Sequence, residues 1–460
     1  MTAFEQYLAA LRGKKAAVLG IGVSNTPLLR LLVSAGARVT ACDKKDEAQL
    51  GGLASELRAL GVSLYTGPDY LSGLEQSGAD IVFRTPGMRP DVPQLCAARE
   101  RGAEVTSEME VFFSVCPCPI IAVTGSDGKT TTTTLIAEML RTEGRRVWLG
   151  GNIGTPLLDQ TGSMEPGDVC VLELSSFQLM SMRQSPHIAV VTNVAPNHLD
   201  VHRDMAEYVD AKRNIFRYQG PDDILVLNMD NEITRGFAGE SAAQVRGFSR
   251  LGRVQHGVQL ENGRVVYDGC GLFAKTDIRL PGEHNVENYM AACAAVYGLV
   301  RPENMKLVAQ RFEGVEHRLE RVRATGGAVW YNDSIASSPT RAIAGLHCFE
   351  GPVVLIAGGY DKHIPFDELG CEICKRVDTL ILCGATAEKI EQAVRNAPQA
   401  QKPRILTVQR LEDAVSKAFE LARAGDTVLF SPACASFDQF PNFMKRGERF
   451  KELVRALPER

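Results

Sequence analysis

Short apolar runs alternate with amphipathic stretches along almost the whole chain of 460 residues. The first run, Ala16-Ala-Val-Leu-Gly20, precedes a helix-type segment at residues 26–35 and a second apolar run at residues 38–42. Buried parallel strands have continuous apolar sequences, and the segment that crosses between two of them is usually a helix. The pattern therefore predicts an α/β fold with parallel sheets.

The alternating pattern falls into three blocks, which we expect to be three domains. A single hydrophobic core stops growing near ~250–300 residues, so a chain of this length already favours two or three domains. We place the domains at residues 1–105, 106–312 and 313–460. The first and last are expected to be Rossmann-like, and the central one to be a P-loop-type ATPase domain with a parallel sheet. Glycine-punctuated strands within residues 244–280 predict a small antiparallel insertion in the central domain.

Composition and charge exclude several classes of function. Lys and Arg total 51, Asp and Glu total 55, and the formal net charge is −4, which offers no basic surface for nucleic acid or an anionic membrane. No apolar run approaches the ~18 residues that span a bilayer. The N-terminal residues also lack the pattern of a secretion signal. We therefore expect a cytoplasmic protein that binds neither nucleic acid nor membrane.

The twelve cysteines are predicted to be reduced thiols. A disulfide or zinc framework was the alternative, but most cysteines are single residues inside apolar runs, as Cys170 is. Cys371 and Cys374 form one CxxC motif without a second pair in a suitable position, and the Cys116-Pro-Cys118 spacing is wrong for a zinc knuckle. Unpaired thiols are typical of a reducing compartment.

A glycine-rich loop, Thr124-Gly-Ser-Asp-Gly-Lys-Thr-Thr131, lies between a strand pattern and a helix pattern. In that context its backbone N–H groups and the helix N-terminus favour an anion. Lys129 is expected to reach the terminal phosphates of a nucleotide, and the Thr130 hydroxyl to bind Mg²⁺. Val123 stands where the usual P-loop has its first glycine, so this is a shorter variant. The predicted phosphate-binding residues are Gly125, Ser126, Asp127, Gly128, Lys129, Thr130 and Thr131.

Two further features limit what this loop can do. Glu173, at the end of the apolar run 169–174, is the candidate carboxylate for the metal; the alternative is a buried glutamate with a structural role. A GTPase is disfavoured, because the sequence contains no Asn-Lys-x-Asp motif. In the first block, Gly20-Ile-Gly22-Val-Ser-Asn25 is only a weak dinucleotide fingerprint, since its third glycine is missing.

The order of the remaining motifs resembles the Mur ligase superfamily, over the whole chain. The motifs that follow the loop are Gly150-Gly-Asn-Ile-Gly154, Leu172-Glu-Leu-Ser-Ser-Phe-Gln178, Asn193-Val-Ala-Pro-Asn-His-Leu-Asp200, Asp210-Ala-Lys212, Pro281-Gly-Glu-His-Asn285, Gly314-Val-Glu-His-Arg318, Asn332-Asp-Ser334 and Ser431-Pro-Ala-Cys-Ala-Ser-Phe-Asp438. The second and last of these look most like the D-glutamate-adding member. The Asp-Asn-Pro-Arg-type signature of the diaminopimelate- and lysine-adding relatives is not found. The alternative is a related amide ligase with another acceptor, of the folylpolyglutamate type.

The resemblance implies an ATP-dependent amide ligase of peptidoglycan precursor synthesis. Such an enzyme phosphorylates the carboxylate of UDP-N-acetylmuramoyl-L-alanine with ATP, and the amine of D-glutamate then attacks the acyl phosphate. Two Mg²⁺ ions and a monomeric protein are also implied. A non-enzymatic ATPase-like protein is disfavoured, because the implied catalytic set is complete. That set is Lys129, Glu173, His198 and Lys212.

The resemblance also assigns roles to particular residues. Thr130, Glu173, His198 and Lys212, the last as a carbamate, are the implied metal ligands. The implied ATP contacts outside the loop are Asn285, Arg318 and Asp333. The implied contacts of the UDP-precursor are Val23, Ser24, Lys44, Thr85, Pro86, Gly87 and Asn152, and those of the amino acid are Ser337, Lys362, Ser436 and Phe443.

Blander roles remain open for some of these positions. His198 could cap a helix, Arg318 could form an interdomain ion pair, and the loops of the first block could be plain strand–helix turns. The sequence also departs from the family pattern at Ile335, where a lysine is usual, so a cation is missing beside the implied amino-acid site.

Overall fold

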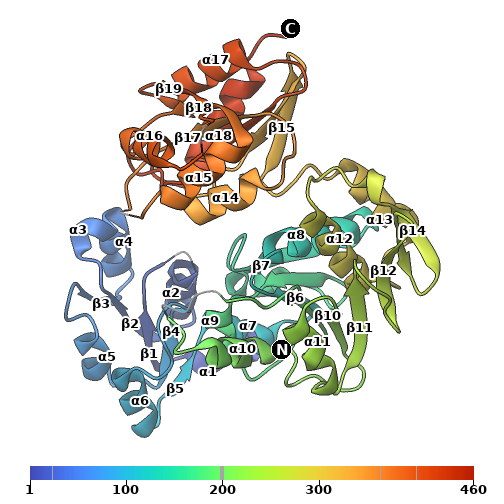
Figure 1. Ribbon diagram of the computed structural model, residues 1–460. Helices are drawn as coiled ribbons and strands as arrows, with labels where there is room; N and C mark the ends of the chain where they lie inside the picture. Colours follow the sequence, from blue (N-terminus) through green and yellow to red (C-terminus); the bar gives the residue numbers. More distant parts are fainter. Residues whose placement is uncertain (23, 197–200, 363, 400, 460) are drawn as a thin grey trace. The chain divides into compact units, whose positions relative to one another are not determined.

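The computed structural model describes residues 1–22, 24–196, 201–362, 364–399 and 401–459. Its chain forms two compact units, one of Met1–Asp277 with Val286–Gln310 and one of Ile278–Asn285 with Arg311–Arg460. Three sheets carry the fold, and most of their neighbouring strands are parallel, which confirms the predicted α/β class (Figure 1). The first two sheets share one compact unit, and the domain boundaries at 105 and 312 stay a prediction.

The first sheet has five parallel strands in the order β3-β2-β1-β4-β5. The strands are β1 (Lys15–Leu19), β2 (Arg38–Asp43), β3 (Ser63–Thr66), β4 (Ile81–Arg84) and β5 (Glu104–Thr106). The helices of this part are α1 (Ala3–Leu11), α2 (Asn25–Ser34), α3 (Glu47–Leu50), α4 (Gly52–Ala59), α5 (Ser72–Ser77), α6 (Pro93–Glu100) and α7 (Glu108–Val115). Alternate residues of β1 enter different cores: Ala16 and Val18 pack on one face, and Ala17 and Leu19 on the other.

The second sheet has nine strands in the order β14-β13-β12-β11-β10-β9-β6-β8-β7. The strands are β6 (Ile120–Thr124), β7 (Val147–Gly151), β8 (Val169–Glu173), β9 (Ile188–Val191), β10 (Ile224–Asn228), β11 (Gln244–Ser249), β12 (Gly257–Glu261), β13 (Arg264–Tyr267) and β14 (Cys270–Ala274). Its helices are α8 (Lys129–Thr142), α9 (Ser176–Leu179), α10 (Met205–Arg213), α11 (Glu232–Gly236), α12 (Glu283–Val296) and α13 (Pro302–Arg311). Short 3-10 helices occur at Leu158–Ser163, Phe237–Gly239 and Lys275–Asp277.

The predicted antiparallel insertion is smaller than expected and belongs to this sheet. Strand β11 runs parallel to both β10 and β12, so only the β12-β13-β14 meander is antiparallel. The meander extends the edge of the parallel sheet. Its turns at Asn262-Gly263 and Asp268-Gly269 place all four residues at positive φ, as short hairpins require.

The third sheet lies in the C-terminal unit, in the order β15-β16-β20-β17-β18-β19. Its strands are β15 (Glu320–Thr325), β16 (Ala328–Asn332), β17 (Val353–Ala357), β18 (Val377–Leu382), β19 (Arg404–Thr407) and β20 (Thr427–Phe430). The helices around it are α14 (Pro339–Leu346), α15 (Asp367–Arg376), α16 (Ala387–Asn396), α17 (Leu411–Leu421) and α18 (Phe443–Arg455) (Figure 1). The β15–β16 hairpin is antiparallel and the other pairs are parallel. Two apolar cores cover the two faces of this sheet.

Helix α8 has an unusual sequence for a helix, because residues 130–134 are all threonine. Two of these hydroxyls bond back to carbonyls one turn earlier, Thr133 to Lys129 at 2.8 Å and Thr134 to Thr130 at 2.8 Å. β-Branched residues lose side-chain freedom in a helix and favour it poorly. The helix is held instead by packing on β6, β7 and β8, through buried side chains such as Leu135 and Met139.

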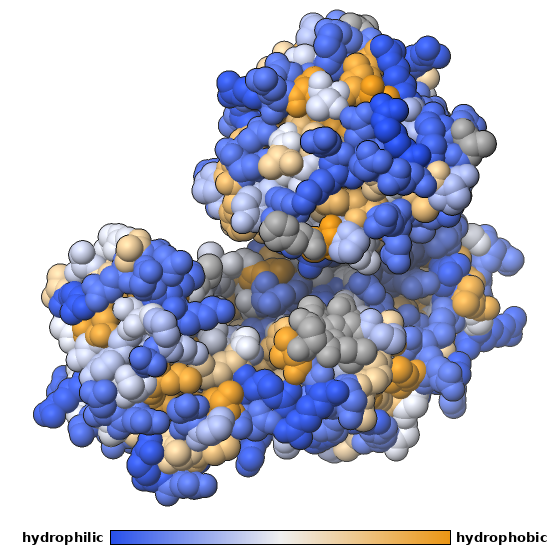
Figure 2. Space-filling model, turned by 60° about the vertical axis from the view of Figure 1, so that its left-hand side comes forward, coloured by the Kyte–Doolittle hydropathy of each residue, from blue (hydrophilic) through white to orange (hydrophobic). Residues whose placement is uncertain are grey.

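The visible surface is mostly hydrophilic, with apolar side chains in small separate patches (Figure 2). Scattered apolar exposure of this kind is normal for a globular protein. Among the described residues, no helix combines the length and the apolar character needed to cross a bilayer.

Candidate active site

The predicted phosphate loop connects the end of β6 to the start of α8. Gly125 has a φ of 154° and Gly128 a φ of 76°, conformations that side chains rarely allow. A Cβ atom at Gly125 would lie 1.9 Å from Thr192 Oγ1, and one at Gly128 would lie 2.3 Å from Asn288 Oδ1. Both glycines are therefore required by backbone geometry and by close packing.

Polar contacts fix this loop from outside as well as from within. The N–H of Asp127 donates to Asn193 Oδ1 at 2.9 Å, and Thr192 Oγ1 donates to the Asp127 carbonyl at 2.6 Å. The Lys129 ammonium donates to the carbonyls of Gly125 at 3.1 Å and Ser126 at 2.9 Å. A cation thus lies across the loop, beside the N-terminus of α8, where an anion is favoured.

Thr130 and Glu173 form a buried oxygen pair beside the loop. The Thr130 hydroxyl donates to Glu173 Oε2 at 2.6 Å, and Asn152 Nδ2 donates to Glu173 Oε1 at 2.8 Å. Glu173 is only 2% exposed, at the carboxyl end of β8, which neighbours β6 in the sheet. A hydroxyl and a carboxylate in this position suit a hard cation such as Mg²⁺, which prefers oxygen ligands. Asn152, implied as a precursor contact, lies here, directly after β7 of the second sheet.

Lys212 enters the same site from helix α10. It is 1% exposed, and its ammonium donates to the Gly125 carbonyl at 2.8 Å and to Thr124 Oγ1 at 3.4 Å. Burial, with the nearby charge of Lys129, lowers the pKa of Lys212 well below that of an exposed lysine. Its amine also lies 4.6 Å from the centre of the Tyr208 ring. The structure therefore brings together Lys212 and the phosphate loop, which are far apart in the sequence.

Two of the implied residues, Val23 and His198, lie outside the described residues. His202, four residues after His198 in the sequence, is described, and sequence reasoning did not single it out. His202 is 2% exposed, its Nε2 lies 2.9 Å from Ser176 Oγ, and its ring stacks on Phe177. This places a buried histidine beside the Ser-Ser-Phe motif that follows Glu173.

The implied precursor-binding loops meet at the carboxyl edge of the first sheet. The N–H of Thr85 donates to the Leu19 carbonyl at 3.0 Å, so the turn after β4 adjoins the loop after β1. Asp43 fixes the latter loop by accepting from the N–H of Ile21 at 2.5 Å. Pro86 and Ser24 are partly exposed at this edge, and Gly87 and Lys44 are exposed. Ligands of open α/β sheets bind at such carboxyl edges.

Sequence reasoning missed Arg84, which holds the turn after β4. This arginine is 1% exposed and donates to the carbonyl of Met88 at 3.0 Å. Its other nitrogen donates to the Phe177 carbonyl at 3.2 Å and to Ser181 Oγ at 2.5 Å, both in the second-sheet part of the same unit. Nothing in the local pattern marks an arginine as buried at the end of an apolar strand. Only its partners, about a hundred residues later, explain it.

We expect Arg84→Met to lower the midpoint of thermal unfolding and to weaken binding of the UDP-precursor. The change leaves the partly buried carbonyls of Met88 and Phe177 without their donor, at a cost of about 3 kcal/mol, or roughly 5 °C for a unit of this size. Calorimetry with and without the precursor measures both effects. Arg99→Met is the control, because Arg99 is exposed and makes one bond, to the Pro90 carbonyl. Equal shifts in the two variants would contradict this role of Arg84.

In the C-terminal unit, the implied amino-acid contacts gather at the carboxyl ends of β17 and β20. Lys362, after β17, donates to the Ser337 carbonyl at 3.2 Å. Ser436 is 2% exposed in the loop after β20, and the Phe443 carbonyl accepts from Ser334 Oγ at 2.8 Å. The structure thus brings Lys362 close to Ser337, and it places Ser436 on the segment before α18 and Phe443 at the first residue of that helix.

A buried arginine that sequence reasoning missed organises this region. Arg446 is 4% exposed and donates to the Ser334, Ala435 and Cys434 carbonyls at 2.8, 2.9 and 3.0 Å. Burial lowers its pKa to about 10. The spacing of Arg446 with Phe450 on α18 was the available signal, because it puts the arginine on the apolar face of the helix.

The implied ATP contacts of this unit are Asn285, Arg318 and Asp333. Burial raises the pKa of Asp333 to about 7, although the Ser431 hydroxyl donates to its Oδ2 at 2.8 Å and the Arg318 charge opposes the rise. Among the described residues, buried Arg318 Nε has no hydrogen-bond partner. Asn285 Nδ2 donates to the Pro281 carbonyl at 2.6 Å. Arg318 and Asp333 thus lie close together, at the end of β16.

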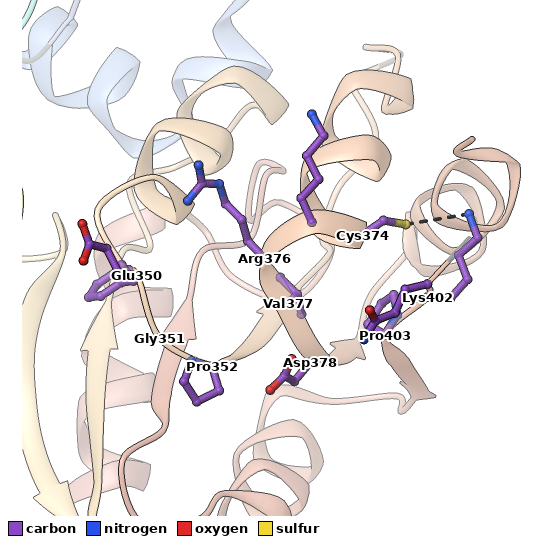
Figure 3. A pocket seen from close by; sticks show the side chains of 12 residues that line it. Glu350, Gly351, Pro352, Cys374, Arg376, Val377, Asp378, Lys402 and Pro403 are labelled. Carbon is purple, nitrogen blue, oxygen red and sulfur yellow. Dashed lines mark hydrogen bonds between the residues drawn. The ribbon is translucent and has the colours of Figure 1, made fainter. Parts of the chain in front are cut away.

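A surface hollow of about 610 Å³ in the C-terminal unit lies away from these residues (Figure 3). Residues at the amino ends of β17 and β18, such as Pro352 and Val377, line it, with Lys402 close to Cys374 Sγ at 3.8 Å. None of the implied amino-acid contacts lines it. Ligand sites of such sheets lie at the opposite, carboxyl ends of the strands.

Comparisons with known proteins agree with this arrangement. Residues 123–296 match the Mur ligase middle domain, and residues 317–434 match the Mur ligase glutamate ligase domain. A curated relative from Acetivibrio thermocellus is 52% identical over 99% of both chains, and one from Clostridium novyi is 50% identical over 99% of both. Both relatives are named UDP-N-acetylmuramoylalanine–D-glutamate ligase.

Solved structures show the same fold at lower identity. UDP-N-acetylmuramate–alanine ligase of Thermotoga maritima is 19% identical over 96% of this chain and 99% of its own, with a TM-score of 0.57. A pseudomurein peptide ligase of Methanothermus fervidus is 20% identical over 97% and 100%, with a TM-score of 0.53. The sheets and the phosphate loop define an α/β enzyme of the phosphate-loop class. The chain belongs to the Mur ligase family, and like its full-length relatives it is a ligase.

Proposed function

We propose that this protein joins D-glutamate to UDP-N-acetylmuramoyl-L-alanine at the expense of ATP, in the synthesis of a peptidoglycan precursor. The supporting observation is the identity of about half of all positions with relatives of that name, over 99% of both chains. A folate-type acceptor has no comparable support.

The chemistry we propose begins with activation of a carboxylate. The carboxylate of the precursor attacks the terminal phosphate of ATP, which releases ADP and leaves an acyl phosphate. The amine of D-glutamate then attacks the acyl carbon, phosphate leaves, and the amine loses a proton. The loop N–H groups and Lys129 hold the transferred phosphate and offset its charge in the transition state.

Thr130 and Glu173 are the residues that would hold a Mg²⁺ ion, and they fit one as adjacent buried oxygens. The ion would neutralise phosphate charge. His198 is proposed as a ligand of a second Mg²⁺ ion. Asn152, which donates to Glu173 Oε1, orients that carboxylate.

Lys212 is proposed to carry a carbamate. An ammonium cannot bind a cation, but a neutral amine adds CO₂ and releases one proton to give an anionic carbamate. The lowered pKa of Lys212 keeps a neutral amine available at a pH where an exposed lysine is charged. Its amine also lies beside the phosphate loop, 2.8 Å from the Gly125 carbonyl.

The remaining binding roles are proposed for the edges of the first and third sheets. Ser24, Lys44 and the Thr85-Pro-Gly87 turn bind the UDP-precursor, with Val23 in the same loop. Asn285, Arg318 and Asp333 contact ATP, and the Arg318 Nε proton is suited to a phosphate oxygen. Lys362, Ser337, Ser436 and Phe443 are the proposed D-glutamate contacts.

Phosphate release tests the proposed reaction. With ATP, Mg²⁺ and UDP-N-acetylmuramoyl-L-alanine, we expect D-glutamate to stimulate release strongly, and L-glutamate, L-lysine or diaminopimelate to give little. The reason is that a site built to bind polar substrate groups rejects analogues that leave those contacts unmade. Equal release with D- and L-glutamate would contradict the assignment. Omission of the precursor is the control for unrelated ATP hydrolysis.

We also propose that the enzyme acts as a monomer in the cytoplasm. All twelve cysteines are unpaired, which supports a reducing compartment.

A further inference from the structure

Three cysteines lie close together at the amino ends of the strands of the second sheet, opposite the end that carries the phosphate loop. Cys116 follows helix α7, Cys118 precedes β6, and Cys170 lies in β8. Their sulfur atoms lie 3.6 Å (116–118), 3.5 Å (116–170) and 3.3 Å (118–170) apart. The Cys116-Pro-Cys118 motif contains only two of these residues. The third, Cys170, lies on a strand about fifty residues later in the sequence.

The backbone fixes this arrangement on two neighbouring strands. Ile120 of β6 is paired with Cys170 of β8, and the N–H of Cys170 donates to the Pro119 carbonyl at 2.9 Å. The two strands and the tight Cys116-Pro-Cys118 segment therefore aim three side chains at one point. Cys170 is 0% and Cys118 6% exposed, whereas Cys116 is partly exposed and gives access from solvent.

The chemistry of the cluster suits a soft ion. Three sulfurs about 3.5 Å apart lie on a circle of ~2.0 Å radius, so an atom at the usual metal–sulfur distance of ~2.3 Å contacts all three from ~1.1 Å above their plane. The Met164 thioether sulfur lies 3.8 Å from Cys170 Sγ and is a further soft donor. Thiolates and thioethers select Cu⁺ and Zn²⁺ over Mg²⁺.

One electrostatic feature assists a bound cation. The Asp168 carboxylate is close enough to Cys118 to act on it electrostatically.

We propose that Cys116, Cys118 and Cys170 form a binding site for one thiophilic d¹⁰ metal ion, Cu⁺ or Zn²⁺. Binding replaces the S–H protons with sulfur–metal bonds, releases those protons to solvent and involves no oxidation. The site is separate from the nucleotide site, although β8 carries both Cys170 and Glu173. An ion here ties the amino ends of β6 and β8 to the end of α7.

The test is a metal titration of the reduced, metal-free, full-length protein in the absence of oxygen. Zn²⁺ and Cu⁺ are added in separate experiments, each in competition with a chromogenic chelator for that ion. We expect one ion per chain, and a rise in the thermal unfolding midpoint with the preferred ion, because the folded state binds it better. The tighter of the two ions identifies the occupant.

Variants separate this site from other thiols. Cys170→Ser and Cys116→Ser should each weaken binding by more than about tenfold, since even supporting groups around a metal are worth ~10–100-fold. Cys116 is partly exposed, so its variant keeps the test valid if Cys170→Ser does not fold. Cys270→Ser, at an exposed thiol outside the cluster, should bind as the unmodified protein does. Cys371→Ser should do the same.

Three outcomes would overturn the proposal. They are no competitive binding of either ion, binding unchanged in Cys116→Ser, and binding lost in Cys371→Ser. None of these outcomes depends on ligase activity, so the metal site and the proposed reaction can fail independently.

Discussion

Lys129→Ala is expected to reduce phosphate release by at least ~10³-fold. Removal of a single fixed group that stabilises transition-state charge already costs ~10²–10³ in rate, and Lys129 is a full charge at the start of α8. Its ammonium contacts the Gly125 and Ser126 carbonyls at 3.1 and 2.9 Å, so it lies across the loop that is proposed to hold the phosphates.

Binding of the UDP-precursor to Lys129→Ala is expected to be nearly unchanged, because the proposed precursor contacts lie mainly on the first sheet. Titration calorimetry measures that binding, and a coupled phosphate assay measures turnover. Lys14→Ala is the matched control, since Lys14 is exposed and outside every proposed site. Normal turnover in Lys129→Ala, or joint loss of turnover and precursor binding, would contradict the proposed role.

Lys212→Ala is expected to lower turnover by at least ~10²-fold and to be partly rescued by added short carboxylates. The reason is that the proposed carbamate is an anion, which acetate or formate can replace in the space that alanine leaves. In the unmodified protein, removal of dissolved CO₂ should lower activity, and bicarbonate should restore it. Native mass spectrometry should show the added mass of CO₂ on Lys212.

The pH dependence of this modification follows from the direction of the pKa shift. A lowered pKa keeps the Lys212 amine neutral down to a lower pH than that of an exposed lysine. The capacity to form a carbamate therefore extends to a lower pH than it does for an exposed lysine, and it is lost as the pH falls through the shifted pKa. Lys212→Met, a long side chain without an amine, is the control that carboxylates should rescue less than Lys212→Ala. Full activity of Lys212→Ala without added carboxylate would show that no carbamate is needed.

The sequence predicted the parts of the fold that depend on local pattern. Apolar runs located β1, β2 and β8, because strands buried on both faces carry a continuous apolar sequence. Partly exposed strands such as β3 and β7 were missed, since their sequences lack that signal.

The site was predictable where its residues are neighbours in the chain. All the predicted phosphate-binding residues of the loop lie within eight consecutive residues, and the strand before the loop and the helix after it were predictable from the sequence pattern. The contact between Lys212 and the loop joins positions 87 residues apart, and only the family resemblance pointed to it. The resemblance did not point to the roles of Arg84, Arg446 or Cys170, the third thiol of the cysteine cluster. Their partners are set by tertiary packing, which periodicity does not encode.

The threonine run of helix α8 affects when this helix can form during folding. Its run of threonines gives little intrinsic helicity, so in an unfolded chain the segment favours extended conformations. We therefore expect the turn that presents the phosphate-binding N–H groups to become ordered when the helix packs on β6, β7 and β8. Nucleotide that binds only the folded domain stabilises it by mass action.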